Sequence, residues 1–149
     1  MADTTTYDRI KSVVDALVTQ LRSRINGSTG YNNRLNHNQI VLGARAINEQ
    51  STYPFVCVPT VSWDVTQVTL GANYMVELEI EIHGYVKSTD DALEKAMDLG
   101  SDIERAIRAD TSLGEGVMGF QLRPCEAVSQ DEFGGCLLTL TGKVPITLT

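Results

Sequence analysis

Three glutamates and a histidine at alternate positions are the residues of this 149-residue sequence best suited to chemistry: Glu77, Glu79, Glu81 and His83. On a β-strand, side chains two residues apart share one face and lie roughly 6.5–7 Å apart. Such a row could hold a divalent metal ion or supply a carboxylate pair for acid–base chemistry. Both chemistries need converging groups from another element, and the facing strands offer threonine and lysine. We therefore interpret the row as a solvated or interface face and expect no catalytic residues, no metal site and no cofactor.

Other short motifs also lack the context that their chemistry requires. Gly114–Gly119 spells GxGxxG, but a dinucleotide fingerprint follows a strand and opens a helix, whereas this one follows a helix and opens a strand. The cysteines Cys57, Cys125 and Cys136 form no CxxC pair, so we interpret them as small buried side chains in a reducing compartment. No GxSxG, HExxH or Walker pattern is present. We expect that the protein is not an enzyme.

The overall composition is that of a globular protein with an acidic surface. Apolar residues make up 42% of the chain and the formal net charge is −7. This charge opposes binding to nucleic acid phosphates, which requires clustered Lys and Arg. The sequence has no apolar run of about 18 residues and its start is polar, so we expect neither a membrane span nor a signal peptide.

The glutamates belong to a long alternating strand whose other face is apolar. That second face carries Tyr74, Val76, Leu78, Ile80, Ile82 and Val86. A strand with one apolar and one polar face predicts a sheet that helices cover on one side only. Amphipathic helices are predicted at 6–25 and 89–109, and strands near 39–46, 55–63, 73–87, 117–128 and 136–148. Pro124 indicates an edge position or a bulge.

These elements predict a single α+β domain over residues 1–149. Its mixed, mostly antiparallel sheet has four to five strands, with two helices packed on one face. The polar loop 27–38 lies outside this pattern. It is long and has little to bury, so we expect it to be poorly ordered until a partner contacts it. The candidate contact residues there are Tyr31, Arg34 and His37.

The order of elements resembles a known family. An amphipathic helix precedes a Tyr-Pro-Phe-Val-Cys-Val strand, and a long strand then ends in His-Gly-Tyr-Val. The helix DDALEKAMDLGSDIERAI follows, closed by Asp-Thr-Ser-Leu-Gly, and the chain ends in a Leu-Thr-Leu-Thr-Gly-Lys-Val-Pro-Ile strand. From about Tyr53 to Leu148 this resembles the tail terminator, or tail completion, proteins of long-tailed bacteriophages. The family often has consecutive glycines after the helix, whereas Glu115 intervenes here.

The resemblance implies a structural protein of the virion, assembled in the host cytoplasm. Such proteins form a homohexameric ring that caps the tail tube, stops its polymerisation and joins the head connector, while DNA passes through the lumen. We then expect Glu77, Glu79 and Glu81 to face the lumen or a subunit interface. Two alternatives remain: another neck or connector protein, such as a stopper or adaptor, and a small metal- or ligand-binding domain.

Overall fold

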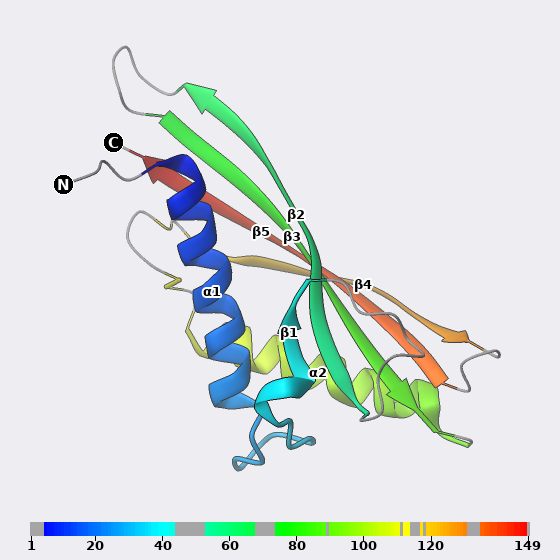
Figure 1. Cartoon of the computed structure of the whole chain (residues 1–149). Helices are drawn as coiled ribbons and strands as arrows, with labels where there is room; N and C mark the ends of the chain where they lie inside the picture. Colours follow the sequence, from blue (N-terminus) through cyan, green and yellow to red (C-terminus); the bar gives the residue numbers. More distant parts are fainter. Residues whose placement is uncertain are drawn as a thin grey trace.

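The computed structural model of the protein describes residues 5–43, 53–67, 74–88, 90–110, 112–113, 117, 119–130 and 135–148. Two α-helices, one short 3₁₀ helix and five strands follow one another along the chain (Figure 1). They are α1 (Thr6–Arg24), η1 (His37–Gln39), β1 (Ile40–Leu42), β2 (Phe55–Gln67), β3 (Tyr74–Lys87), α2 (Ala92–Ala109), β4 (Gln121–Gln130) and β5 (Gly135–Leu148).

The strands form one mixed sheet in the order β1-β2-β3-β5-β4. β1 pairs with β2 in parallel, and the other neighbours are antiparallel. The predicted α+β class is therefore confirmed. Because β5 lies between β3 and β4, the connection from β3 through α2 to β4 crosses over β5, as expected for a strand–helix–strand unit.

One continuous core joins both helices to one face of the sheet. Along β3 it contains Val76, Leu78, Ile80 and Ile82, all fully buried, and it extends to Leu17 and Leu21 of α1 and to Leu99 and Ile103 of α2. The two helices also meet directly, since Gln20 Nε2 donates to the backbone oxygens of Ala106 (2.6 Å) and Asp110 (2.7 Å). Both helices thus cover the apolar face that the alternation in β3 predicts.

Two glycines let other groups approach this face closely. A Cβ atom on Gly142 of β5 would lie 2.2 Å from the ring of Phe120, and one on Gly84 of β3 would lie 2.9 Å from Leu99. Phe120 therefore fills the space above a position that has no side chain of its own. The helix-facing layer can be tight here only because these residues are glycines.

The helix starts follow their local capping chemistry. Thr5 and Asp8 form a capping box, in which each side chain accepts a hydrogen bond from the backbone N–H of the other. α2 begins at Ala92, later than the predicted residue 89, and its N-cap Asp91 makes no capping hydrogen bond. The Asp91 carboxylate bonds instead to the Ser88 hydroxyl, which lowers the pKa of Asp91. Ser88 and Asp91 are thus bonded through their side chains, and both precede the first turn of the helix.

Several strand boundaries differ from the prediction. β2 continues to Gln67 rather than ending at residue 63, because all of that length pairs with β3. β4 begins at Gln121, while Val117 makes only a single bridge to Ile146. β1 ends at Leu42, and residues 44–52 lie outside the described part. Pro124 does mark an edge strand with an irregular register, as predicted.

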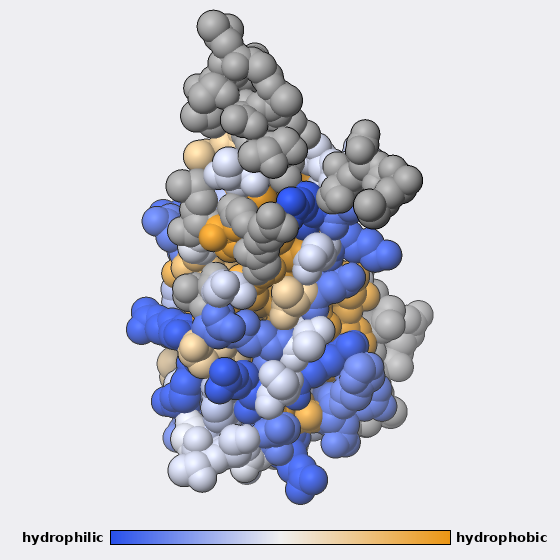
Figure 2. All heavy atoms as spheres, turned by 90° about the vertical axis from the view of Figure 1, so that its left-hand side faces the viewer, coloured by the Kyte–Doolittle hydropathy of each residue, from blue (hydrophilic) through white to orange (hydrophobic). Residues whose placement is uncertain are grey.

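Apolar surface appears between hydrophilic side chains on the side of the molecule that carries α1 (Figure 2). The large hydrophobic residues that are exposed include Tyr7, Trp63 and Val65, as well as Leu93 and Met97 on α2. Trp63 and Tyr7 make an edge-to-face contact with ring centroids 5.6 Å apart. In the described residues, no helix is both long and apolar enough to cross a bilayer.

Candidate functional site: the uncovered face of the sheet

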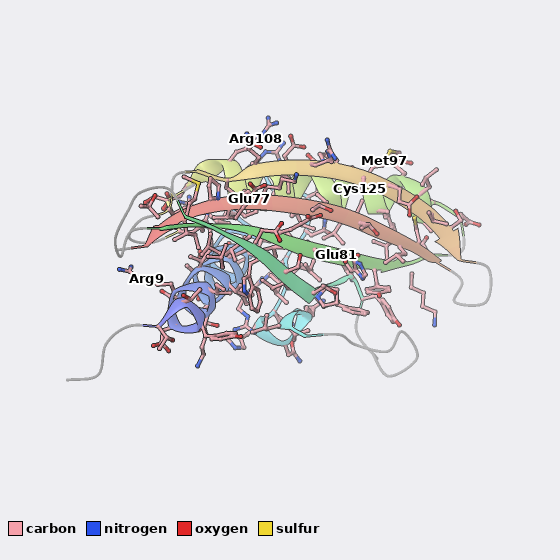
Figure 3. The ribbon with its side chains drawn as sticks, turned by 90° about the horizontal axis from the view of Figure 1, so that it is seen from above. Arg9, Glu77, Glu81, Met97, Arg108 and Cys125 are labelled. Atoms are coloured by element: carbon pink, nitrogen blue, oxygen red, sulfur yellow. The ribbon has the colours of Figure 1, made fainter. Side chains whose placement is uncertain are left out.

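The sheet face opposite the helices is formed by β2, β3, β5 and β4, and we call it the uncovered face. Strand register places its side chains in cross-strand rows, because directly opposed residues of an antiparallel pair point to the same side. One row contains Ser62, Glu79 and Lys143, and the next contains Thr60, Glu81 and Thr141. Among the described residues, no helix packs over these rows (Figure 3).

Carboxylates dominate one half of this face. Glu77 and Glu79 are exposed, and Asp64 of β2 lies directly opposite Glu77. The nearest cation is Lys143 on β5, whose Nζ lies 3.9 Å from Glu77 Oε1 while both side chains stay about half exposed at 48% and 57%. An ion pair this long and this exposed contributes little stability. The predicted acidic face therefore exists, and Lys143 neutralises it only in part.

Glu81 and His83 interact with each other through their polar atoms. His83 Nε2 lies 2.6 Å from Glu81 Oε1, and the two side chains are 20% and 40% exposed. A metal site needs more ligands than one carboxylate and one imidazole. No cluster of three or more potential metal ligands occurs in the part of the chain that the structure describes. The arrangement thus brings together two members of the sequence row without building a coordination sphere.

The far end of the uncovered face is apolar, which the alternation in β3 did not reveal. Tyr85 is 7% exposed and stacks on Phe55 with ring centroids 4.5 Å apart, and Tyr53 lies 5.4 Å from Phe55. We call these three residues the aromatic cluster; Cys57, Val41 and Leu137 pack against it. Burial raises the pKa of the Tyr85 phenol above its ordinary value. Tyr85 falls on the same face of β3 as the three glutamates and His83, where alternation predicts a polar surface, yet it is buried because neighbouring strands surround it with large apolar side chains.

A shallow hollow lies between the acidic half and the edge strand β4. Its volume is about 290 Å³, and its lining includes Glu79, Arg123, Cys125, Thr141 and Lys143. Cys125 is exposed, with its Sγ 3.4 Å from Thr141 Oγ1, whereas Cys57 and Cys136 are buried as expected. The expectation of burial fails for Cys125 because it falls where the register shifts between Pro124 and Glu126 of the outermost strand.

The loop 27–38 lies against α2, on the helix side of the sheet, and not on the uncovered face. The backbone N–H groups of Asn32 and Asn33 each donate to the Asp102 carboxylate at 2.8 Å. Tyr31 is half-buried under the Arg105 guanidinium, 5.8 Å from the ring centroid. This packing differs from the expectation of a poorly ordered loop, because one buried carboxylate accepts hydrogen bonds from two of the loop's backbone N–H groups.

The other two candidate contact residues of this loop remain at its surface. Arg34 forms an isolated bridge with Asn26, and His37 opens η1; both side chains are exposed. The structure therefore does not bring Tyr31, Arg34 and His37 together with Glu77, Glu79 and Glu81.

Asp102 is the residue that sequence reasoning missed. It is fully buried on the same helix face as Leu99, Ile103 and Ala106. The sequence could have indicated this residue, because it is a carboxylate among the apolar residues of one helix face. A charge buried there requires hydrogen-bond donors from another part of the chain. Its partners come from residues about 70 positions away, so the sequence could not identify them.

Comparisons with known proteins do not assign the chain to a family. The sequence matches no protein-family model, and it matches no curated protein.

Proposed function

We propose that the protein is a non-enzymatic structural component of a phage tail, a ring-forming tail terminator. In this role, copies of the chain cap the finished tail tube, stop its polymerisation and present a surface to the head connector. The proposal rests on the resemblance in element order together with the one-sided build of the domain. A domain that leaves one face of its sheet uncovered is suited to line a channel or to meet another subunit.

The observation that carries the proposal is the charge of the uncovered face. Register assigns five carboxylates to it, against three cations. The carboxylates are Asp64, Glu77, Glu79, Glu81 and Glu126, and the cations are Lys87, Arg123 and Lys143. If this face lines a lumen, every subunit adds net negative charge to the wall. DNA then passes without adhering, because the wall offers few cations that could replace its counterions.

The alternatives gain less support from the described residues. A metal-binding domain would need a ligand cluster, which these residues lack. A stopper or adaptor would share the ring and the negative lumen but would bind the portal side and not the tube. The nature of the partner therefore distinguishes the terminator from other neck proteins.

The decisive experiment measures tube length. Tail-tube protein from the same genome is polymerised with and without this protein, and lengths are measured by electron microscopy. We expect added protein to stop growth and to appear as a ring at one tube end. The variant Ile80→Asp, which places a charge at a fully buried position and cannot fold normally, is the negative control. Unchanged tube lengths, or binding to portal complexes only, would contradict the terminator role.

A further inference from the structure

Besides the outer edge of the three-residue strand β1, two strand edges of the sheet are unpaired in the described residues. β4 is the outermost strand at one end. At the other end, β1 pairs only with Val56–Val58, so β2 from Thr60 to Gln67 has β3 on one side and no described strand on the other (Figure 1). Open edges carry unpaired backbone N–H and C=O groups, which makes them templates for a strand from another chain.

The directions of these two edges allow them to pair between copies. β3 and β4 are both antiparallel to β5, so β4 runs parallel to β3 and antiparallel to β2. Copies arranged around a rotation axis keep their strand directions relative to that axis. β4 of one copy therefore meets β2 of the next copy as an antiparallel neighbour, the more stable of the two pairings.

The side chains of the two edges also match. On the uncovered face, β2 presents Ser62 and Asp64, while β4 presents Arg123 and Cys125. Neither Asp64 nor Arg123 has an ion-pair partner among the described residues. If β4 of one copy pairs with β2 of the next, a register exists in which Asp64 lies directly opposite Arg123. The same register places Ser62 opposite Cys125.

On the helix side of the sheet, apolar side chains at the β2 edge remain exposed to solvent in the single chain. Trp63 is 38% exposed and Val65 is 59% exposed, although the residues beside them on β3, Leu78 and Val76, are fully buried. The partner strand would place Leu122, on the helix side of β4, next to this pair. Pairing of the edges thus buries apolar surface that the monomer leaves in water.

The two edges are offset from each other along the strand direction, as they are in a sheet that closes into a barrel. The open part of β2 pairs with residues 74–81 of β3. β4 does not touch β3, but the residues of β5 that pair with β4 also pair with residues 79–87 of β3, so β4 lies at the height of those residues. In the register that pairs Asp64 with Arg123, a position level with residue 77 meets one level with residue 81, which is an offset of four residues. This offset corresponds to roughly 13 Å along the strands, over a sideways step of roughly 19 Å for four strands. The ratio gives a strand tilt of about 35°, at the lower end of the range of closed β-barrels.

We propose that Thr60–Gln67 of one copy adds to β4 of the next, head to tail, so that the sheet continues from subunit to subunit. The occupant of each open edge is thus a second copy of this chain. The inference rests on the proposed ring assembly and specifies which surfaces form it.

Disulfide trapping tests the contact, because the native Cys125 already lies on one of the two edges. Ser62→Cys is oxidised under conditions in which the protein self-associates, with or without tail tubes, and is analysed on a non-reducing gel. Cross-strand neighbours lie within disulfide range. Because each copy uses two different edges, we expect a ladder of covalent oligomers, whereas a two-fold contact would stop at the dimer. Ser62→Cys with Cys125→Ser, and Thr19→Cys on exposed α1, should give no ladder.

Charge exchange gives an independent readout. Asp64→Arg and Arg123→Asp should each weaken self-association roughly threefold to tenfold, because each places like charges opposite each other. Mixing the two variants should restore assembly, since each then offers the edge that the other needs. Such mixed rings alternate, so they require an even number of subunits. Lys11→Asp on exposed α1 is the control and should leave association unchanged.

The outcomes separate this inference from the proposed function. Rings that cap tubes but give neither a ladder nor charge rescue would overturn the edge pairing and leave the terminator role intact. A ladder from rings that never bind tubes would support the edge pairing and contradict the terminator role. A chain that stays monomeric with tubes present would overturn both.

Discussion

Asp102 in α2 and Asn33 in the loop 27–38 are joined by two hydrogen bonds of 2.8 Å, from the backbone N–H and the side-chain Nδ2 of Asn33 to Asp102 Oδ2. The other carboxylate oxygen accepts the Asn32 N–H at the same distance, and the Arg105 guanidinium lies 3.9 Å from it. One buried side chain therefore holds the first half of the loop on the helix layer.

Replacing Asp102 should loosen the loop and destabilise the domain. Asp102→Leu leaves three donors without their acceptor, so we expect the free energy of unfolding in urea to fall by about 2–4 kcal/mol. Amide exchange of Asn32 and Asn33 should accelerate, and proteolysis at Arg34 should appear. The control is Asp98→Leu on the exposed side of α2, which should change stability by less than about 1 kcal/mol. Equal stability of the two variants would contradict the structural role of Asp102.

Phe120 and Gly142 make a second tight relationship that mutation can test. Gly142→Ala should cost about 1–3 kcal/mol, because its Cβ would overlap the Phe120 ring. Combining it with Phe120→Ala should cost less than the sum of the two single changes, and a double-mutant cycle from urea unfolding measures the difference.

Gly100→Ala in α2 serves as the comparison for Gly142→Ala. The nearest atom to its new Cβ is a terminal methyl of Leu138 at 3.2 Å, and alanine gains about 1 kcal/mol of helix propensity over glycine. We therefore expect a near-neutral effect. A loss as large as that of Gly142→Ala would indicate that the helix–sheet spacing is as rigid as the Phe120 contact.

Periodicity predicted the parts of this fold that depend on one strand or helix alone. It identified α1, β3, β5 and the covered side of the sheet, since apolar residues recur there at the period of each element. It does not give the burial of Tyr85 or the exposure of Cys125, because both depend on strands far away in the sequence. The same limit applies to Asp102, whose hydrogen-bond donors lie far away in the sequence. It also applies to the open edge of β2, because the pattern of one strand does not show how much of its length a neighbouring strand covers.

The N-terminal cap of α1 should make stability depend on acid pH. Hydrogen bonds from the backbone N–H and then the hydroxyl of Thr5 lower the pKa of Asp8 below its ordinary value of 3.8. Because the folded pKa is the lower one, this stabilisation is complete above pH 3.8 and is lost as the pH falls through the folded pKa. Relative to wild type, Asp8→Asn should be less stable at pH 7, and the gap should narrow at pH 3. Unfolding curves at both pH values measure this, with Thr19→Ala on the exposed side of α1 as a control that removes no titrating group.

The acidic face gives the prediction most closely tied to function. If Glu77, Glu79 and Glu81 line a lumen, Glu79→Lys should leave ring assembly intact and slow DNA passage, because the new cation binds phosphate. If they lie at a subunit interface, the same change should weaken the ring, and high salt should weaken the wild type. Sedimentation at low and high salt measures assembly, and DNA ejection from complemented particles measures passage.

The control for this experiment is Glu94→Lys on the exposed side of α2, which changes the net charge equally but lies on the helix layer. It should affect neither assembly nor DNA passage. The structure sharpens the comparison because Lys143 lies directly opposite Glu79 on β5, so Glu79→Lys places two cations side by side on the uncovered face. That pair costs little in an exposed site but is a strong phosphate-binding element beside DNA. A Glu77→Gln, Glu79→Gln, Glu81→Gln variant that assembles and gives fully infectious particles would show that the carboxylates have no role in either process.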